Sequence, residues 1–400
     1  MQKMRPRIIY INAYENEFLM RSLNRIMANN MVRSYKHQFL LNYLFEKGYD
    51  VRNLLIRPKD ISVKTLPLKS YMVRSFDALF VEHVNKIRHL PIITLKDIRP
   101  TDIVVGYLVY SYQFEVLKLC NCYKILFGNH FISISEPISL KEAGVNLFAN
   151  EIDLTNCEFV KRYMDIQGVK PLLVPYIYAD RFGISKEFAK RENKVMAIGT
   201  SSTAKYAQGY DLYKAMFETD LIQPMRQAIY EKKDQLIGWL DSYISYIYED
   251  ERKIKENKPL RWYNRFIHTQ NSATQSSYTK FDMVETFNKY KMFICPEELV
   301  GMPGIGFVEG MACGCAYIGL NHEMYTCLGL IPDYHYITYD GTLEGIELKV
   351  REYQNKPMEL AEIAKRGCEF VREHFNTRRV AEYFEQQLMQ NYNEYLKTIQ

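Results

Sequence analysis

A glycine-rich loop between two apolar runs is the part of this sequence best suited to chemistry. The run Met292 to Cys295 is stopped by a proline, and the loop that follows contains Gly304 and Gly306. Apolar residues then recur at helical spacing around Glu309 until Gly314. Free backbone N–H groups and the helix dipole favour an anion at a helix start, and glycines let a ligand approach the backbone closely. The pattern therefore predicts a strand, a loop and a short helix that bind an anionic group such as a phosphate.

The same block resembles the C-terminal signature of retaining GT-B glycosyltransferases, which take a sugar from a nucleotide diphosphate sugar. The match is closest over residues 309–314, which read EGMACG. The family's second glutamate holds the donor ribose, and the resemblance gives that role to Glu309, with Gly304, Ile305 and Gly306 lining the donor. The family's first glutamate falls eight positions earlier, where this chain has Gly301. Either a loop insertion lets Glu298 contact the sugar instead, or that role is lost.

A second donor-binding segment is predicted where the apolar run Val195 to Gly199 ends. In the resembling family this strand is followed by an arginine and, a few residues later, by a lysine, and both hold the diphosphate. Thr200 and Gln208 stand at those positions here, while Lys205 lies three residues before Gln208 in the same loop. The resemblance therefore makes Gly199, Thr200 and Lys205 donor-binding candidates. The alternative is an ordinary polar turn between a strand and a helix.

Three further candidates come from the resemblance alone. His130 follows the apolar run Lys124 to Phe127, where the family often places a histidine that faces the donor sugar. Tyr278 and Lys280 precede the predicted helix Phe281 to Tyr290, in a loop that lies beside the nucleobase in the family. The simpler alternative for each is a loop or core residue with no ligand.

The elements around these residues predict an α/β protein of the GT-B fold, with two Rossmann-like domains facing across a cleft. Residues 1–185 are expected to form the acceptor-binding domain and residues 186–375 the donor-binding domain. Residues 376–400 are expected to form a helix that crosses back to the first domain. The region 211–258, with many Tyr, Lys and Glu residues, is helical in character.

Composition is that of an ordinary globular protein, with 47% hydrophobic and 25% charged residues. The chain of 400 residues is long enough for two domains. It contains no apolar run of the roughly 18 residues that span a bilayer, and its start is too weakly apolar for a signal peptide. Eight irregularly spaced cysteines indicate core residues in a reducing cytoplasm and not a disulfide framework or a zinc site.

Charge is unevenly distributed along the sequence. Residues 1–100 contain 18 Lys and Arg against 8 Asp and Glu, a net charge of +10, whereas the whole chain carries +5. A basic first quarter indicates an anionic partner or simply a solvated basic face. No nucleic-acid-binding motif is present, so an anionic surface on the inner face of the membrane, or a lipid-linked acceptor, is the favoured partner.

The resemblance thus predicts a retaining, metal-independent glycosyltransferase that builds a cell-surface polysaccharide. The chain has no Asp-x-Asp motif of the metal-dependent type, and no cofactor is expected. The alternatives are a nucleotide-sugar epimerase of the same fold and a non-catalytic nucleotide-sugar-binding protein. A dinucleotide oxidoreductase is disfavoured because no GxGxxG follows the first predicted strand.

Overall fold

The computed structural model of the chain describes residues 5–11, 38–55, 92–107, 111–128, 132, 134–207, 209–246 and 282–399. Its contacts separate two compact units. Unit 1 comprises residues 1–174, 207–216 and 381–400, and unit 2 comprises residues 175–206 and 217–380. No helix among the described residues is long and apolar enough to cross a membrane.

Unit 1 is built on a parallel sheet of seven strands in the order β3-β2-β1-β4-β5-β7-β9. The strands are β1 (Ile8–Tyr10), β2 (Val51–Leu55), β3 (Ile92–Thr94), β4 (Ile103–Tyr107), β5 (Tyr123–Phe127), β7 (Leu147–Asn150) and β9 (Lys170–Leu173). The strand order reverses between β1 and β4, as in Rossmann-like domains. Every residue of β1, β5 and β7 is buried, and all but Lys124 and Asn150 are apolar or aromatic, because helices cover both faces of a parallel sheet.

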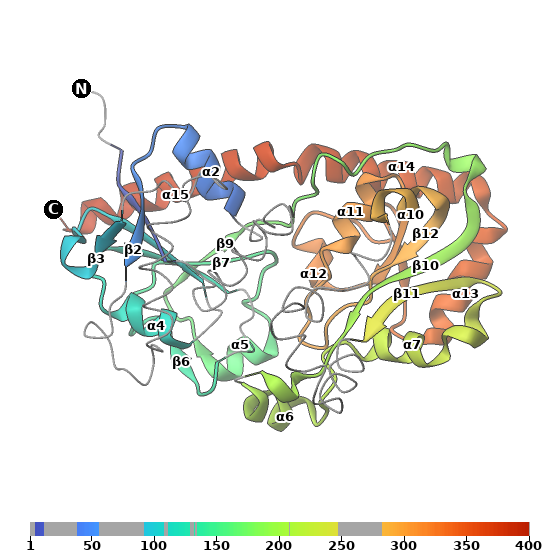
Figure 1. Cartoon of the computed structure of the whole chain (residues 1–400), viewed down its shortest axis with the longest axis horizontal. Helices are drawn as coiled ribbons and strands as arrows, with labels where there is room; N and C mark the ends of the chain where they lie inside the picture. Colours follow the sequence, from blue (N-terminus) through green and yellow to red (C-terminus); the bar gives the residue numbers. More distant parts are fainter. Residues whose placement is uncertain are drawn as a thin grey trace, which may run out of the picture. The chain divides into compact units, whose positions relative to one another are not determined.

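The helices of unit 1 lie on both faces of this sheet. They are α2 (Gln38–Glu46), the 3-10 helix η2 (Leu95–Asp97), α4 (Ser111–Lys118), α5 (Glu158–Tyr163), α6 (Tyr210–Phe217, in unit 1 up to residue 216) and most of α15 (Thr377–Ile399). Unit 1 also contains a separate pair of short strands, β6 (Ile138–Ser139) and β8 (Met164–Asp165). Helices α2 and α15 run along one face of the sheet, and α4 lies on the other (Figure 1).

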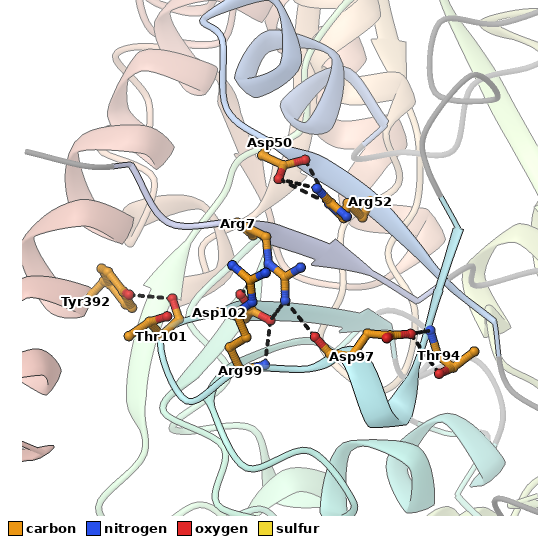
Figure 2. Close-up of polar contacts among 9 residues, drawn as sticks. All are labelled: Arg7, Asp50, Arg52, Thr94, Asp97, Arg99, Thr101, Asp102 and Tyr392. Carbon is orange, nitrogen blue, oxygen red and sulfur yellow. Dashed lines mark hydrogen bonds and ion pairs between the residues drawn. The ribbon is translucent and has the colours of Figure 1, made fainter.

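A buried ion pair joins two neighbouring strands of unit 1 at their amino ends (Figure 2). Arg7, just before β1, donates from Nε and Nη2 to the two carboxylate oxygens of Asp102, just before β4, at 2.8 and 2.6 Å. The Asp102 side chain is 1% exposed and also accepts the backbone N–H of Arg99. The pair therefore holds β1 and β4 in register at the edge of the sheet opposite their carboxyl ends.

The last helix returns to unit 1, as the sequence predicted. Residues 381–400 belong to that unit, and Tyr392 donates its hydroxyl hydrogen to the backbone oxygen of Thr101 at 2.6 Å. The hydroxyls of Tyr43, in α2, and Tyr49, just after it, donate to the carboxylate of Glu385. These bonds fix α15 beside α2 (Figure 1).

Unit 2 contains a second parallel sheet of five strands in the order β11-β10-β12-β13-β14. The strands are β10 (Glu192–Ser201), β11 (Leu240–Tyr246), β12 (Tyr290–Ile294), β13 (Ala316–Leu320) and β14 (Ile337–Tyr339). The helices are η4 (Phe188–Lys190), η5 (Ala204–Tyr206), α7 (Pro224–Leu236), α10 (Met283–Lys289), α11 (Gly306–Ala312), α12 (Glu323–Thr326), α13 (Leu343–Gln354) and α14 (Pro357–His374). Helices α7 and α13 lie on one side of the sheet and α10 and α11 on the other (Figure 1).

One element of unit 2 differs from the sequence prediction. The region 211–258 was expected to be helical, but Leu240–Tyr246 is an edge strand that pairs with β10 over seven residues. Its polar residues are half-buried and its Leu240 and Ile244 are buried, a pattern too weak to identify a strand locally. The pairing with β10 decides the structure of this segment, because parallel strand pairing joins residues far apart in sequence.

Candidate functional site

The sheet of unit 2 has a point at which the chain order reverses, between β10 and β12. The chain passes from β10 to β11 on one side and then to β12 on the other. Loops that leave the carboxyl ends of two such strands diverge, and open α/β sheets bind ligands at that place. Gly199 and Thr200 end one strand, and Pro296 to Glu298 follow the other, so both predicted donor segments meet at this point.

The predicted strand, loop and short helix are confirmed as β12, the loop 295–305 and α11. Gly314 follows the helix with φ +68, a conformation that favours glycine, and its N–H donates to the backbone oxygen of Met311. Glu309 lies in the first turn of α11 and is half-buried.

Two arginines hold the carboxyl end of α11. Arg191 donates to the backbone oxygens of Cys313 and Gly314 at 2.9 and 3.1 Å, and Arg372 donates to that of Ala312 at 2.9 Å. Cations at this end of a helix interact favourably with its dipole. Burial lowers the pKa of the Arg191 guanidinium from its ordinary value. The carboxyl end of α11 is thus fixed, and its amino end follows the glycine-rich loop.

A buried arginine lies where the two strand ends meet. Arg226, from the first turn of α7, is 6% exposed. Its Nε donates to the backbone oxygen of Pro296 at 2.6 Å, and its Nη1 donates to that of Thr200 at 3.1 Å. A single guanidinium therefore bridges the loops after β12 and β10 and brings a positive charge to the reversal point.

Two glycines make room for this guanidinium. A Cβ on Gly199 would lie 2.9 Å from Arg226 Nε, and φ at Gly199 is +134. A Cβ on Gly304 would lie 2.9 Å from Arg226 Nη2 and 2.5 Å from the Sγ atom of Cys295. Burial raises the pKa of the Cys295 thiol to about 11, so this neighbour is uncharged at neutral pH. Both glycines were donor-binding candidates, and both lie against the same cation.

Glu298 is joined to the loop after β10 by one glutamine. Gln223 donates from Nε2 to Glu298 Oε1 at 3.2 Å, while its own Oε1 accepts from both the backbone N and the Oγ of Ser202 at 2.9 Å. The Glu298 backbone forms a tight turn, in which its N–H donates to Met302 O at 2.8 Å. Gly301 lies in that turn with φ +81.

The neighbouring glutamate, Glu297, is buried and serves a different purpose. Tyr325 and Tyr339 donate their hydroxyl hydrogens to its carboxylate at 2.6 and 3.1 Å, and the N–H of Leu320 donates at 3.0 Å. Burial raises the pKa of Tyr325 well above its usual value, so its hydroxyl stays a donor. Glu297 therefore ties the carboxyl ends of β12, β13 and β14 together and supports the loop that carries Glu298.

The remaining sequence candidates are distributed differently. Lys205 lies in η5 after β10, is exposed, and its backbone N–H donates to the hydroxyl of Thr203. Ile305 immediately precedes α11 and is half-buried. His130, Tyr278 and Lys280 lie outside the described residues, and so does Gln208. The structure thus brings Gly199, Thr200, Gly304 and Glu298 together, through residues that the sequence interpretation had not selected.

Those unselected residues are Arg226, Gln223 and Glu297. Only Glu297 could have been selected from the sequence, because it directly follows the proline that ends the run Met292 to Cys295. Gln223 and Arg226 flank the helix start marked by Pro224, but nothing local connects that start with β10 or β12. Only the folded chain brings their side chains to the strand ends.

Comparisons with known proteins agree with this architecture. Residues 221–386 match the family model described as glycosyl transferase-like. The fold is similar to that of sucrose-phosphate synthase from Thermosynechococcus elongatus (TM-score 0.53, 10% identity, covering 98% of this chain and 100% of that one). It is also similar to HepE from Anabaena, in a structure with UDP and glucose (TM-score 0.54, 10% identity, covering 96% of this chain and 100% of that one). No curated protein sequence matches the chain.

The chain therefore has the GT-B fold, and its residues 221–386 are similar to the glycosyl transferase-like family. The resemblance to GT-B glycosyltransferases, drawn from the signature loop, is confirmed. Retention of configuration and metal independence remain predictions.

Proposed function

We propose that this protein transfers a sugar from a nucleotide diphosphate sugar to a hydroxyl group of a glycan or lipid-linked glycan. The observation that carries the proposal is the buried Arg226 guanidinium at the reversal point between β10 and β12. In the resembling family an arginine follows the strand that ends at Gly199, and this chain has Thr200 there. Arg226 brings a guanidinium to the same strand end from α7, where it donates to the Thr200 carbonyl.

In this proposal Arg226 and the exposed Lys205 supply positive charge to the diphosphate. Glu309 holds the ribose, and the loop residues Gly304, Ile305 and Gly306 lie against the donor. Thr200 lines the site from the β10 side. His130, Tyr278 and Lys280, which lie outside the described residues, remain proposed contacts of the sugar and the base.

The reaction breaks the bond between the anomeric carbon and the diphosphate oxygen, and that oxygen keeps the electron pair. The acceptor hydroxyl oxygen forms the new bond to the same carbon and gives its proton to the departing diphosphate. Negative charge develops on the diphosphate as the bond breaks, and fixed positive charge there lowers the barrier. The charge of Arg226 acts without rearrangement of the side chain, because its position is set by two backbone carbonyls.

Uridine nucleotides are the first donors to test, since HepE was solved with UDP-glucose as well as with UDP. Unit 1 is assigned to the acceptor by the resemblance, and surface polysaccharide synthesis on the inner face of the membrane is the proposed setting. The stereochemical outcome is proposed to be retention, and the reaction is proposed to need no metal.

Calorimetry with uridine, UMP and UDP tests the proposal directly. We expect the affinity to rise with each added phosphate. We expect Arg226→Gln to lower the affinity for UDP by about ten- to a hundredfold, which is the effect of losing a charge-assisted hydrogen bond, and to change the affinity for uridine little. Turnover is then measured with a panel of uridine diphosphate sugars. Equal affinities for uridine and UDP would exclude a diphosphate site, and UDP binding without turnover on any donor would indicate a binding protein.

A further inference from the structure

Glu298 is out of register with the family's first glutamate, yet the structure holds its side chain at the reversal point. The residue is half-buried, and its Oε1 accepts the hydrogen bond from Gln223. The described residues donate no hydrogen bond to its second oxygen, Oε2. One carboxylate oxygen is thus held in place while the other is available to a ligand hydroxyl.

The orientation of the Gln223 amide is determined by its other partner. The backbone N–H of Ser202 can only donate, so the Gln223 atom 2.9 Å from it must be the oxygen. The amide nitrogen then faces Glu298 and donates to the carboxylate. Gln223 is 5% exposed and is the N-cap residue of α7, but its side chain makes no capping hydrogen bond. The side chain is therefore committed to the two loops and not to its own helix.

The backbone around this contact is also fixed. The N–H of Leu299, next to Glu298, donates to the backbone oxygen of Ile222, next to Gln223, at 2.7 Å. On the other side, the N–H of Ile222 donates to the backbone oxygen of Ser202 at 3.1 Å. Three chain segments, the loops after β10 and β12 and the start of α7, are thus joined at both backbone and side-chain level.

We propose that Gln223 is the positioning residue that aims Glu298 at the donor sugar, so that Glu298 takes the place of the glutamate missing at Gly301. This inference rests on the proposed function. The amide of Gln223 selects one carboxylate rotamer of Glu298 and links it to the loop that follows Thr200 on the phosphate side. A sugar hydroxyl then donates to the remaining oxygen of Glu298.

A reciprocal exchange of the two side chains tests the proposal. Gln223→Glu keeps the acceptor for Ser202 but sets two carboxylates against each other, which turns Glu298 away. Glu298→Gln in the same chain restores a donor–acceptor pair with the direction reversed. We expect Q223E alone to lower kcat by about ten- to a hundredfold, with less than about a threefold change in the affinity for UDP.

The matched control is Gln227→Glu, one turn further along α7. Gln227 also bridges a serine and a glutamate, since its Oε1 accepts from Ser201 Oγ at 2.8 Å and its Nε2 donates to Glu231 at 2.7 Å. Glu231 is exposed and lies on the same helix, so Q227E makes the same chemical change without a contact to Glu298 or to the loop after β12. We expect Q227E to keep the wild-type kcat.

The double variant Q223E/E298Q is expected to match the wild type in thermal stability and UDP affinity but not in kcat, because an amide then faces the sugar. Recovery of kcat in the double variant would overturn the proposal by showing that the charge of Glu298 is dispensable. Equal kcat values for Q223E and Q227E would also overturn it. Both outcomes require an active wild type, so they are distinct from a failure of the proposed function, in which the wild type transfers no sugar.

Discussion

Gly304 offers the sharpest test of how the site is packed. Gly304→Ala would place a Cβ 2.5 Å from Cys295 Sγ and 2.9 Å from Arg226 Nη2, both closer than a carbon contact allows. Arg226 cannot move without releasing its bonds to the backbone oxygens of Pro296 and Thr200. Cys295 is itself buried. The loop that carries Gly304 must therefore move away from β12.

Forcing a methyl group into a packed site costs about 1–3 kcal/mol of stability. For a domain of this size each kcal/mol lowers the midpoint of thermal unfolding by roughly 2–4 °C. We therefore expect Gly304→Ala to lower the midpoint by about 2–12 °C and to weaken UDP binding as well, because the displaced loop lies against the proposed donor. Scanning calorimetry and UDP titration measure the two effects.

Gly238→Ala is the matched control for this prediction. A Cβ on Gly238 would meet no atom within 4 Å, and the residue is exposed. This substitution should leave stability unchanged or raise it slightly, by reducing the freedom of the unfolded chain. If Gly304→Ala and Gly238→Ala had the same midpoint and the same UDP affinity, the close packing of the loop on Arg226 and Cys295 would be refuted.

Four further predictions address the rest of the chain. Glu309→Gln should weaken UDP binding by about ten- to a hundredfold through loss of a charge-assisted hydrogen bond to the ribose, and unchanged affinity in calorimetry would remove Glu309 from the site. Lys205→Ala should lower turnover and leave uridine binding unchanged, because its ammonium acts on the phosphates; a parallel fall in both affinities would indicate a structural role. Arg7→Met should destabilise unit 1 by about 3–5 kcal/mol in urea unfolding, since it leaves the buried Asp102 carboxylate without its guanidinium, and a loss below 1 kcal/mol would contradict this. Residues 1–100 should give reversible binding to anionic liposomes, with about 1 kcal/mol for each basic residue near the surface, and equal co-sedimentation with neutral lipid, or none at low salt, would show that this charge serves solubility.

Sequence alone was sufficient to place the local unit on which the site depends. The run Met292 to Cys295, the glycine-rich loop and the helix around Glu309 all form where their spacing predicted. The reason is that each depends on neighbours within a few residues: a proline that ends a strand, glycines that permit a tight loop, and Gly314 at φ +68 after the helix. In unit 1, the apolar run Lys124 to Phe127 likewise lies within a strand, β5.

Contacts between residues far apart in the chain could not be predicted from the sequence. Leu240–Tyr246 becomes a strand because it pairs with β10, a partner more than 40 residues away that no local pattern reveals. The absence of the consensus arginine after Gly199 could be read from the sequence, but the residue that brings positive charge there could not. Arg226 reaches the strand end because α7 packs beside β10, and that packing depends on the whole hydrophobic core of unit 2.

Glu298 shows most clearly which features the sequence predicts and which depend on the tertiary structure. By sequence it was a candidate, out of register with the family's glutamate and separated by 75 residues from Gln223. Composition and spacing determined which residue types were available near the signature loop: a carboxylate, glycines and an apolar strand. The tertiary structure alone decided that Gln223 and Ser202 hold this carboxylate and that Arg226 lies at the same strand ends, because hydrogen-bond direction and burial exist only once the three segments are folded together.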